Sequence, residues 1–187
     1  GTYVKMHGRY AVITAAHVVS KNRYMWVIGR DDETVLGRVA YVNHEADIAV
    51  LVVSKLETRK PIKFRPRRKA NLVGEPVMYT GFPGKHDLLT IKGSIAGYEE
   101  SYLIMHSYGW FGSSGSGVYD SQGRLLGVVS ALDVATFWTP QAIEDIVWVA
   151  SIWEIDLEML KIRVLTEPEI PKQFPGAAAP KRGGLRD

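Results

Sequence analysis

Apolar and polar residues follow one another in short runs along most of the chain, and glycine, proline or aspartate turns separate the runs. In the first half, runs rich in β-branched and aromatic residues predict strands at residues 3–6, 10–14, 24–28, 35–42 and 48–53. In the second half, the same pattern predicts strands at residues 76–80, 88–97, 102–106, 117–119, 125–130 and 146–152. Many short strands at even spacing are typical of β-barrels or a β-sandwich, so the pattern predicts an all-β fold.

Three segments depart from the strand pattern. Residues 153–162 carry apolar side chains among charged ones and predict an amphipathic helix that packs beside the second group of strands. Residues 163–187 are rich in Pro, Gly, Ala and Lys, which predicts a flexible or partner-ordered tail. Residues 59–69 carry two prolines and predict a linker. The chain is therefore expected to consist of a domain at 1–58, this linker, a domain at 70–162 and the tail.

Charge is concentrated in the linker. The formal net charge is +3, yet the linker sequence RKPIKFRPRRK holds seven basic residues and no acidic one. Such a run could form a patch for nucleic acid or another acidic partner. Phe64 is its only aromatic residue and offers little for base stacking, so we favour a solvated connector and do not expect nucleic-acid binding.

The absence of cysteine and of long apolar runs limits the possible classes of protein. The chain has 187 residues, no Cys and 46% hydrophobic residues, a composition typical of a globular protein. A zinc–thiolate site, a cysteine nucleophile and a disulfide framework are excluded. The longest apolar run, residues 48–53, is far shorter than a membrane-spanning helix requires. The compartment in which the protein works stays open.

Three short motifs carry candidate chemistry. They are, in chain order, Thr14-Ala15-Ala16-His17, Asp47-Ile48-Ala49-Val50-Leu51 and Gly112-Ser113-Ser114-Gly115-Ser116-Gly117. A histidine, an aspartate and a serine on a glycine-rich turn can supply a general base, the acid that orients it and a nucleophile. Each motif alone also has a structural interpretation: a core histidine, a turn aspartate or a flexible Gly/Ser loop.

Together the motifs resemble the histidine, acid and serine segments of the chymotrypsin-like serine proteases. The chain is most similar to the compact bacterial and viral branch with HtrA (Deg)-type domains, and the resemblance covers nearly all of residues 1–162. It extends to Gly74-Glu75-Pro76-Val77, Gly81-Phe82-Pro83-Gly84 and Gly127-Val128-Val129-Ser130. The resemblance implies two six-stranded antiparallel β-barrels, with the first strand of the first barrel lying ahead of Gly1, so the chain is expected to be processed or partial.

The resemblance implies a catalytic triad of Ser114 as nucleophile, His17 as general base and Asp47 as the acid that orients the histidine. Imidazole is largely neutral at neutral pH and can therefore accept the serine proton. Glu45, two residues before Asp47, is the alternative acid and fits the motif less well. No metal or organic cofactor is needed for this chemistry.

The resemblance also selects Ser114 over the neighbouring hydroxyls of Ser113 and Ser116, because the family places its nucleophile third in the six-residue motif. The backbone N–H groups of Gly112 and Ser114 would form the oxyanion hole. In the digestive enzymes of the family, the residue before the nucleophile is an aspartate that pairs with a newly cut N-terminus. Ser113 stands at that position here, so this form of activation is not expected.

Substrate-binding residues are implied by position in the same family. Tyr108 is expected near the base of the pocket for the substrate side chain that precedes the cut, and Ala131 and Leu132 along its wall. Ser130 is expected to hydrogen-bond the catalytic aspartate and to line the pocket. Tyr108 is not the aspartate that selects Arg or Lys, so a small or apolar side chain is the expected preference.

Two function classes remain open at the sequence level. The favoured one is a serine endopeptidase that cleaves protein or peptide substrates through an acyl-enzyme. The alternative is a protease-fold structural domain of a larger assembly, such as a viral particle, docked through residues 163–187 and no longer cleaving. The motifs favour the first class, because all three catalytic residue types are present.

Overall fold

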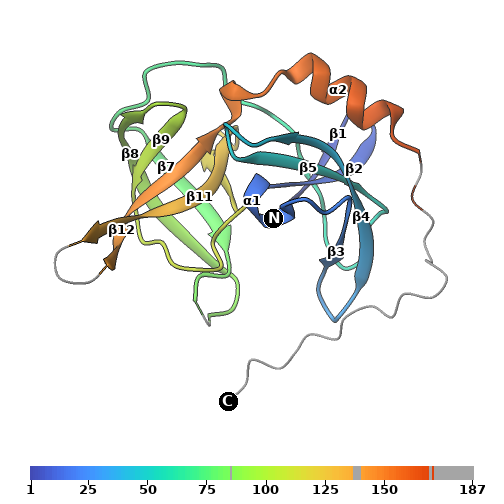
Figure 1. Ribbon diagram of the computed structural model, residues 1–187, viewed down its shortest axis with the longest axis horizontal. Helices are drawn as coiled ribbons and strands as arrows, with labels where there is room; N and C mark the ends of the chain where they lie inside the picture. The colour runs from blue at the N-terminus through green and yellow to red at the C-terminus, as the bar shows by residue number, and fades with distance from the viewer. Residues whose placement is uncertain (85, 137–139, 169, 171–187) are drawn as a thin grey trace.

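The computed structural model describes residues 1–84, 86–136, 140–168 and 170. Two groups of strands lie side by side, the first on the right of Figure 1 and the second on the left. The predicted all-β fold is confirmed, with a closed antiparallel barrel and a second sheet, and a helix follows the last strand. None of the described helices is long and apolar enough to cross a membrane.

The first group is a six-stranded sheet in the order β3-β4-β5-β2-β1-β6. Its strands are β1 (Thr2–Met6), β2 (Arg9–Thr14), β3 (Tyr24–Ile28), β4 (Thr34–Asn43), β5 (Ile48–Val53) and β6 (Ile62–Lys63). Strand β5 is buried along its whole length, as expected for a continuous apolar run bounded by turns. Strand β6 was not predicted, because its two residues are too few to form a pattern; it lies parallel to β1.

The second group is a closed antiparallel barrel in the order β10-β11-β12-β9-β8-β7. Its strands are β7 (Pro76–Gly81), β8 (Leu89–Glu99), β9 (Tyr102–His106), β10 (Gly117–Asp120), β11 (Leu125–Thr136) and β12 (Pro140–Ser151). Strands β11 and β12 are longer than predicted. The two strands pair with each other as far as Thr136 and Pro140. Pairing satisfies their backbone N–H and C=O groups, so the strands extend beyond the apolar runs from which they were predicted.

A shared core joins the two groups of strands. Val4, Ile13 and Val50 of the first sheet belong to the same buried cluster as Leu125 and Val128 of the second group. Burial of this much apolar surface between the groups favours one fixed arrangement over two independently moving domains. Residues carried on different groups can therefore be held at constant distances across the boundary.

The C-terminal helix lies elsewhere than predicted. Helix α2 (Leu157–Thr166) begins after Asp156, whose side chain accepts a hydrogen bond from the Met159 N–H, and Ile152–Glu154 form a separate 3₁₀ turn. The helix covers the first sheet rather than the second barrel, as Figure 1 shows, because Leu160 and Val164 pack into the shared core. Residues 163–166 thus belong to a helix, and most of the predicted tail lies outside the described residues.

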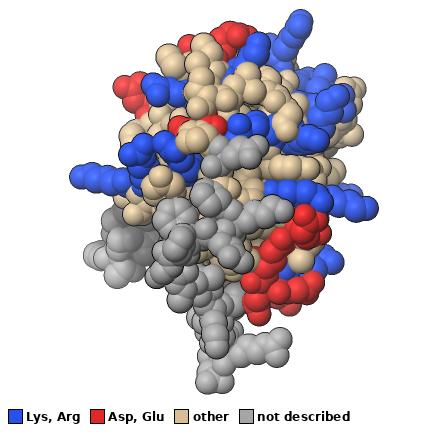
Figure 2. All heavy atoms as spheres, turned by 90° about the vertical axis from the view of Figure 1, so that its right-hand side faces the viewer, with Lys and Arg blue, Asp and Glu red and all other residues tan. Residues whose placement is uncertain are grey.

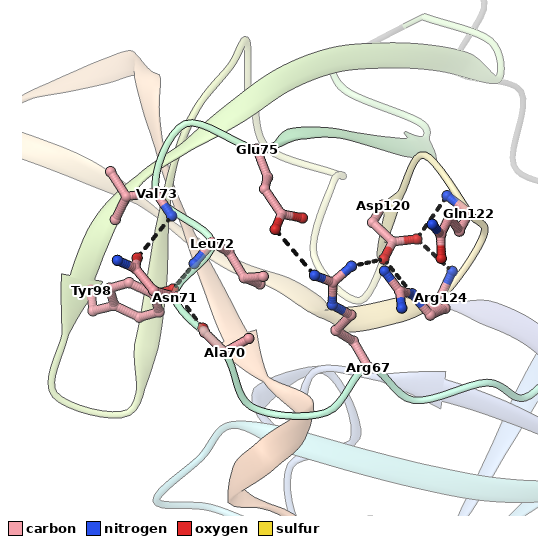
Figure 3. Close-up of polar contacts among 10 residues, drawn as sticks. All are labelled: Arg67, Ala70, Asn71, Leu72, Val73, Glu75, Tyr98, Asp120, Gln122 and Arg124. Carbon is pink, nitrogen blue, oxygen red and sulfur yellow. Dashed lines mark hydrogen bonds and ion pairs between the residues drawn. The ribbon is translucent and has the colours of Figure 1, made fainter.

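Arg67 fixes the linker to the second barrel (Figure 3). Its guanidinium lies 2.6 Å from Oδ2 of Asp120 and 3.1 Å from Oε1 of Glu75, while Arg124 binds the same Asp120 oxygen at 2.7 Å. Asp120 is only 3% exposed, so two cations compensate a buried carboxylate. The indole of Trp153 donates to the Arg67 carbonyl at 2.8 Å. The linker is therefore an anchored segment at this point rather than a solvated connector.

Candidate active site

His17 and Asp47 meet at one end of the first sheet. His17 lies in the one-turn helix α1 (Ala16–Val19), which follows β2, and Asp47 ends the turn before β5. Asp47 accepts two hydrogen bonds from His17: Nδ1 to Oδ2 at 2.8 Å and the backbone N–H to Oδ1 at 2.9 Å. The carboxylate therefore fixes both the position of the helix turn and the orientation of the ring.

Ser130 connects this pair to the second barrel. Its hydroxyl donates to Oδ2 of Asp47, which is 8% exposed. Ser130 lies at an irregularity in the pairing of β11 with β12, where the register shifts between Val129 and Ala131. A bulge of this kind redirects a side chain, and here it coincides with the turn of Ser130 toward the first sheet.

Tyr102 is a further member of this group, and no motif in the sequence pointed to it. Burial raises the pKa of its phenol, and the nearby Asp47 carboxylate acts in the same direction, while a hydrogen bond with Ser130 opposes both. Tyr102 begins β9, which is far from both partners in the sequence. Its ring also packs edge-on against Trp148. The buried Asp47 carboxylate thus lies beside the neutral hydroxyl groups of Ser130 and Tyr102, which belong to strands β11 and β9 of the second barrel.

The Gly/Ser motif forms a tight turn with two left-handed glycines, Gly112 at φ 98° and Gly115 at φ 80°. The turn buries Ser113 and Ser116, which are 1% and 3% exposed, whereas Ser114 remains partly exposed. Ser114 Oγ makes a long hydrogen bond, 3.4 Å, to the Ser130 carbonyl. Among the three serines, Ser114 is therefore the one that a substrate can reach.

His17 and Ser114 line one cavity of about 410 Å³ at the boundary between the two groups of strands. The other residues that line it are Trp110, Phe111, Val129, Ser130, Ala131 and Leu132. In the described structure no hydrogen bond joins His17 to Ser114, and such contacts commonly tighten only when substrate binds. The cavity is thus a largely apolar chamber with an imidazole and a hydroxyl in its wall.

The N–H groups of Gly112 and Ser114 are available to a ligand. Within the turn, the N–H groups of Ser113, Gly115 and Ser116 donate to backbone carbonyls. In the described part of the chain, the N–H groups of Gly112 and Ser114 donate to no protein acceptor. Two such donors, two residues apart on a tight turn, can bind the negative charge that develops on an attacked carbonyl oxygen.

Tyr108 lies away from this cavity. Its backbone carbonyl accepts a hydrogen bond from the Tyr79 hydroxyl at 2.8 Å, and its side chain is 40% exposed. It lines a separate hollow of about 700 Å³ together with Lys92, His106 and Asp145. Ala131 and Leu132 do line the cavity beside Ser114, as do Trp110 and Phe111, which sequence analysis did not single out.

The remaining candidates are accounted for by the structure. Glu45, the alternative acid, is exposed and does not contact His17 in the described hydrogen bonds. Among the described residues, no group of three or more His, Asp or Glu side chains is arranged to hold a metal ion.

Comparisons with known proteins agree with this geometry. The family model of the trypsin-like peptidase domain matches residues 1–128. No curated protein sequence matches the chain. Among solved structures, the HtrA-type protease AlgW with a tripeptide superposes with a TM-score of 0.68 and 19% identity, covering 87% of this chain and 55% of AlgW. AlgW with a decapeptide gives a TM-score of 0.64 and 18% identity, covering 86% and 49%.

The family model establishes the family of this chain, and the solved structures establish only its fold. The identity to the solved structures is below 20%, so they establish the fold, and this chain spans about half the length of those proteins. The family model covers more than half of the chain and includes all three motifs. The chain therefore belongs to the family of trypsin-like peptidase domains and has an HtrA-like serine protease fold.

Proposed function

We propose that the chain is a serine endopeptidase in which Ser114, His17 and Asp47 act as a catalytic triad. The observation that carries this proposal is the double contact of Asp47 with His17, beside a cavity that also receives the Ser114 hydroxyl. With Nδ1 bonded to Asp47, the ring has Nε2 left to accept a proton from Ser114. Ser130 and Tyr102 are proposed to hold Asp47 in place from the second barrel.

The reaction would proceed in two halves. Ser114 Oγ attacks the scissile carbonyl carbon while His17 takes the hydroxyl proton, and the N–H groups of Gly112 and Ser114 stabilise the resulting oxyanion. His17 then gives the proton to the leaving amine, and an acyl-Ser114 ester remains. Water, deprotonated by His17, attacks the ester, and the acid product leaves as Ser114 regains its proton.

The cavity beside Ser114 supports a small or apolar residue before the cut. Trp110, Phe111, Val129, Ala131 and Leu132 give it an apolar wall, and among the residues that the structure describes no Asp or Glu lines it. Binding of an apolar side chain against such a wall is favourable, because apolar surface is removed from water. A cationic side chain would lose its hydration there without gaining an acidic partner. AlgW structures contain bound peptides, and we propose that a peptide occupies the corresponding cleft here.

Nucleic-acid binding stays the weaker proposal. Arg67, one of the basic residues of the linker, is engaged by Asp120 and Glu75. Figure 2 shows that, on the face seen there, Lys and Arg side chains are interrupted by acidic and other residues. A mixed face of this kind is typical of a solvated surface rather than of a continuous path for a phosphate backbone.

Labelling with a fluorophosphonate tests the proposed function, because the adduct requires an activated serine. We expect labelling of the wild type on Ser114, as identified by peptide mapping, and none in Ser114→Ala or His17→Ala. Ser116→Ala is the matched control and should still be labelled. Absence of labelling in folded wild-type protein would contradict a protease and favour the non-cleaving assembly domain.

A further inference from the structure

The Tyr79 hydroxyl lies beneath the turn that carries Ser114. Tyr79 is on β7 and is 0% exposed. Its hydroxyl donates to the Tyr108 carbonyl at 2.8 Å and lies 3.3 Å from Ser113 Oγ. A phenol has one proton, and a carbonyl can only accept, so the Ser113 hydroxyl must be the donor in the second contact. The two bonds are thus directed from Ser113 to Tyr79 and from Tyr79 to Tyr108.

The two hydrogen bonds of Tyr79 connect the ends of the segment from Tyr108 to Ser113, just before Ser114. Tyr108 and Ser113 stand at the two ends of the segment that contains Gly112, one of the two proposed oxyanion donors. Within the segment, the Ser113 N–H donates to the Trp110 carbonyl at 3.1 Å. Burial raises the pKa of Tyr79, so the phenol stays neutral and keeps its proton for the Tyr108 carbonyl.

The turn after β7 restrains the same segment. The Gly84 N–H donates to the Phe111 carbonyl at 2.6 Å. The C=O and N–H of a trans peptide point in opposite directions, so this bond directs the Gly112 N–H away from Gly84. A Cβ at Gly112 would lie 2.4 Å from the Phe82 carbonyl oxygen, which leaves room only for glycine.

We infer that Tyr79 is a positioning residue for the oxyanion turn, acting through Ser113 and the Tyr108 carbonyl. This inference rests on the proposed function. A buried chain of hydrogen bonds between uncharged groups would then hold Ser113, the residue before the proposed nucleophile. The turn would be held without an ion pair and without a free amino terminus, since neither Tyr79 nor Ser113 needs a charged partner.

Tyr79→Phe tests the inference, with Tyr119→Phe as the matched control. Tyr119 belongs to the same barrel, and its hydroxyl is buried without a hydrogen-bond partner in the described structure, so its removal breaks no bond. We expect Tyr79→Phe to lower the maximal rate of fluorophosphonate labelling by about 10- to 100-fold, since small displacements at a reacting centre have effects of this size. The probe concentration at half-maximal rate should not change, because the cavity is not altered.

Ser113→Ala is the second variant, because it breaks the same chain at its other end. It should slow labelling by a similar factor, and the double variant should be no slower than the slower single one, since the residues act as a unit. All variants are compared at temperatures well below their melting midpoints, so that unfolding does not contribute.

Amide hydrogen exchange separates this inference from the proposed function. Tyr79→Phe should speed exchange in residues 109–116 at least several-fold, whereas Tyr119→Phe should not. If folded wild type is not labelled, the proposed function fails, and the positioning role of Tyr79 is then decided by hydrogen exchange alone. Faster exchange in Tyr79→Phe than in wild type supports that role, and unchanged exchange overturns it. If wild type is labelled and Tyr79→Phe is labelled at the same rate, the inference is overturned.

Discussion

Gly115 lies directly against Thr14, across the boundary between the two groups of strands. A Cβ on Gly115 would be 2.1 Å from Thr14 Oγ1, closer than any real contact. Thr14 is three residues before His17, and Gly115 follows Ser114. The serine motif and the histidine motif therefore pack directly against each other, with the Gly115 backbone against the Thr14 hydroxyl.

Gly115→Ala should lower both stability and activity. The left-handed φ of 80° alone costs a non-glycine residue about 1–2 kcal/mol, and the contact with Thr14 adds to that cost. Gly123→Ala is the control, since Gly123 has a similar φ of 69° but nothing within 4 Å of the added Cβ. Denaturant unfolding should give the larger loss for Gly115→Ala, and equal losses would contradict the proposed packing.

Asp47→Asn should preserve the fold and lower turnover by up to about 10⁴-fold. Asparagine tolerates the positive φ of 50° at this position, and its amide oxygen can still accept the His17 backbone N–H. The amide NH₂ would then face Nδ1 and hold the ring in the wrong tautomer. The measurement is the labelling rate or peptide turnover, and Glu45→Gln, which removes the exposed alternative acid, should keep wild-type activity.

Arg67→Ala should destabilise the protein by about 3 kcal/mol, because it leaves Asp120 buried with one cation instead of two. Arg68→Ala removes a neighbouring exposed cation and should change stability by no more than about 0.5 kcal/mol. Chemical denaturation at neutral pH measures both. A loss for Arg68→Ala as large as that for Arg67→Ala would show that linker charge in general, not this ion pair, is responsible.

Stability should fall between about pH 10 and pH 12. Burial raises the pKa of Tyr119 to about 12, above the ordinary value of 10.0 that it regains on unfolding. In that window the unfolded chain has lost the phenol proton and the folded chain retains it, so each pH unit removes up to about 1.4 kcal/mol. Unfolding free energies at pH 9 and pH 11 should differ less in Tyr119→Phe than in wild type, and an unchanged difference would exclude this origin.

Much of the fold could be predicted from the sequence, because the decisive patterns are local. The continuous apolar run 48–53 forms the fully buried strand β5, and the other predicted strand runs form the first sheet and the closed barrel. The candidate residues of the three motifs lie where elements begin or end: His17 in the one-turn helix after β2, Asp47 just before β5 and Ser114 on a glycine-rich turn. The helix prediction was less accurate. Its start was set by the cap at Asp156, and its packing surface was set by Leu160 and Val164 entering the shared core.

For the candidate site, sequence alone determined the three residue types and their order, and tertiary structure decided the rest. The family resemblance selects Ser114 by its place in the motif, whereas only the folded turn buries the hydroxyl-bearing neighbours Ser113 and Ser116. Tyr79, Tyr102 and Arg67 carry no motif, since their partners are distant in the chain and meet them only after the barrel closes. Hydrogen bonds between distant residues leave no periodic signal, so the side chains that hold the site could be found only in three dimensions.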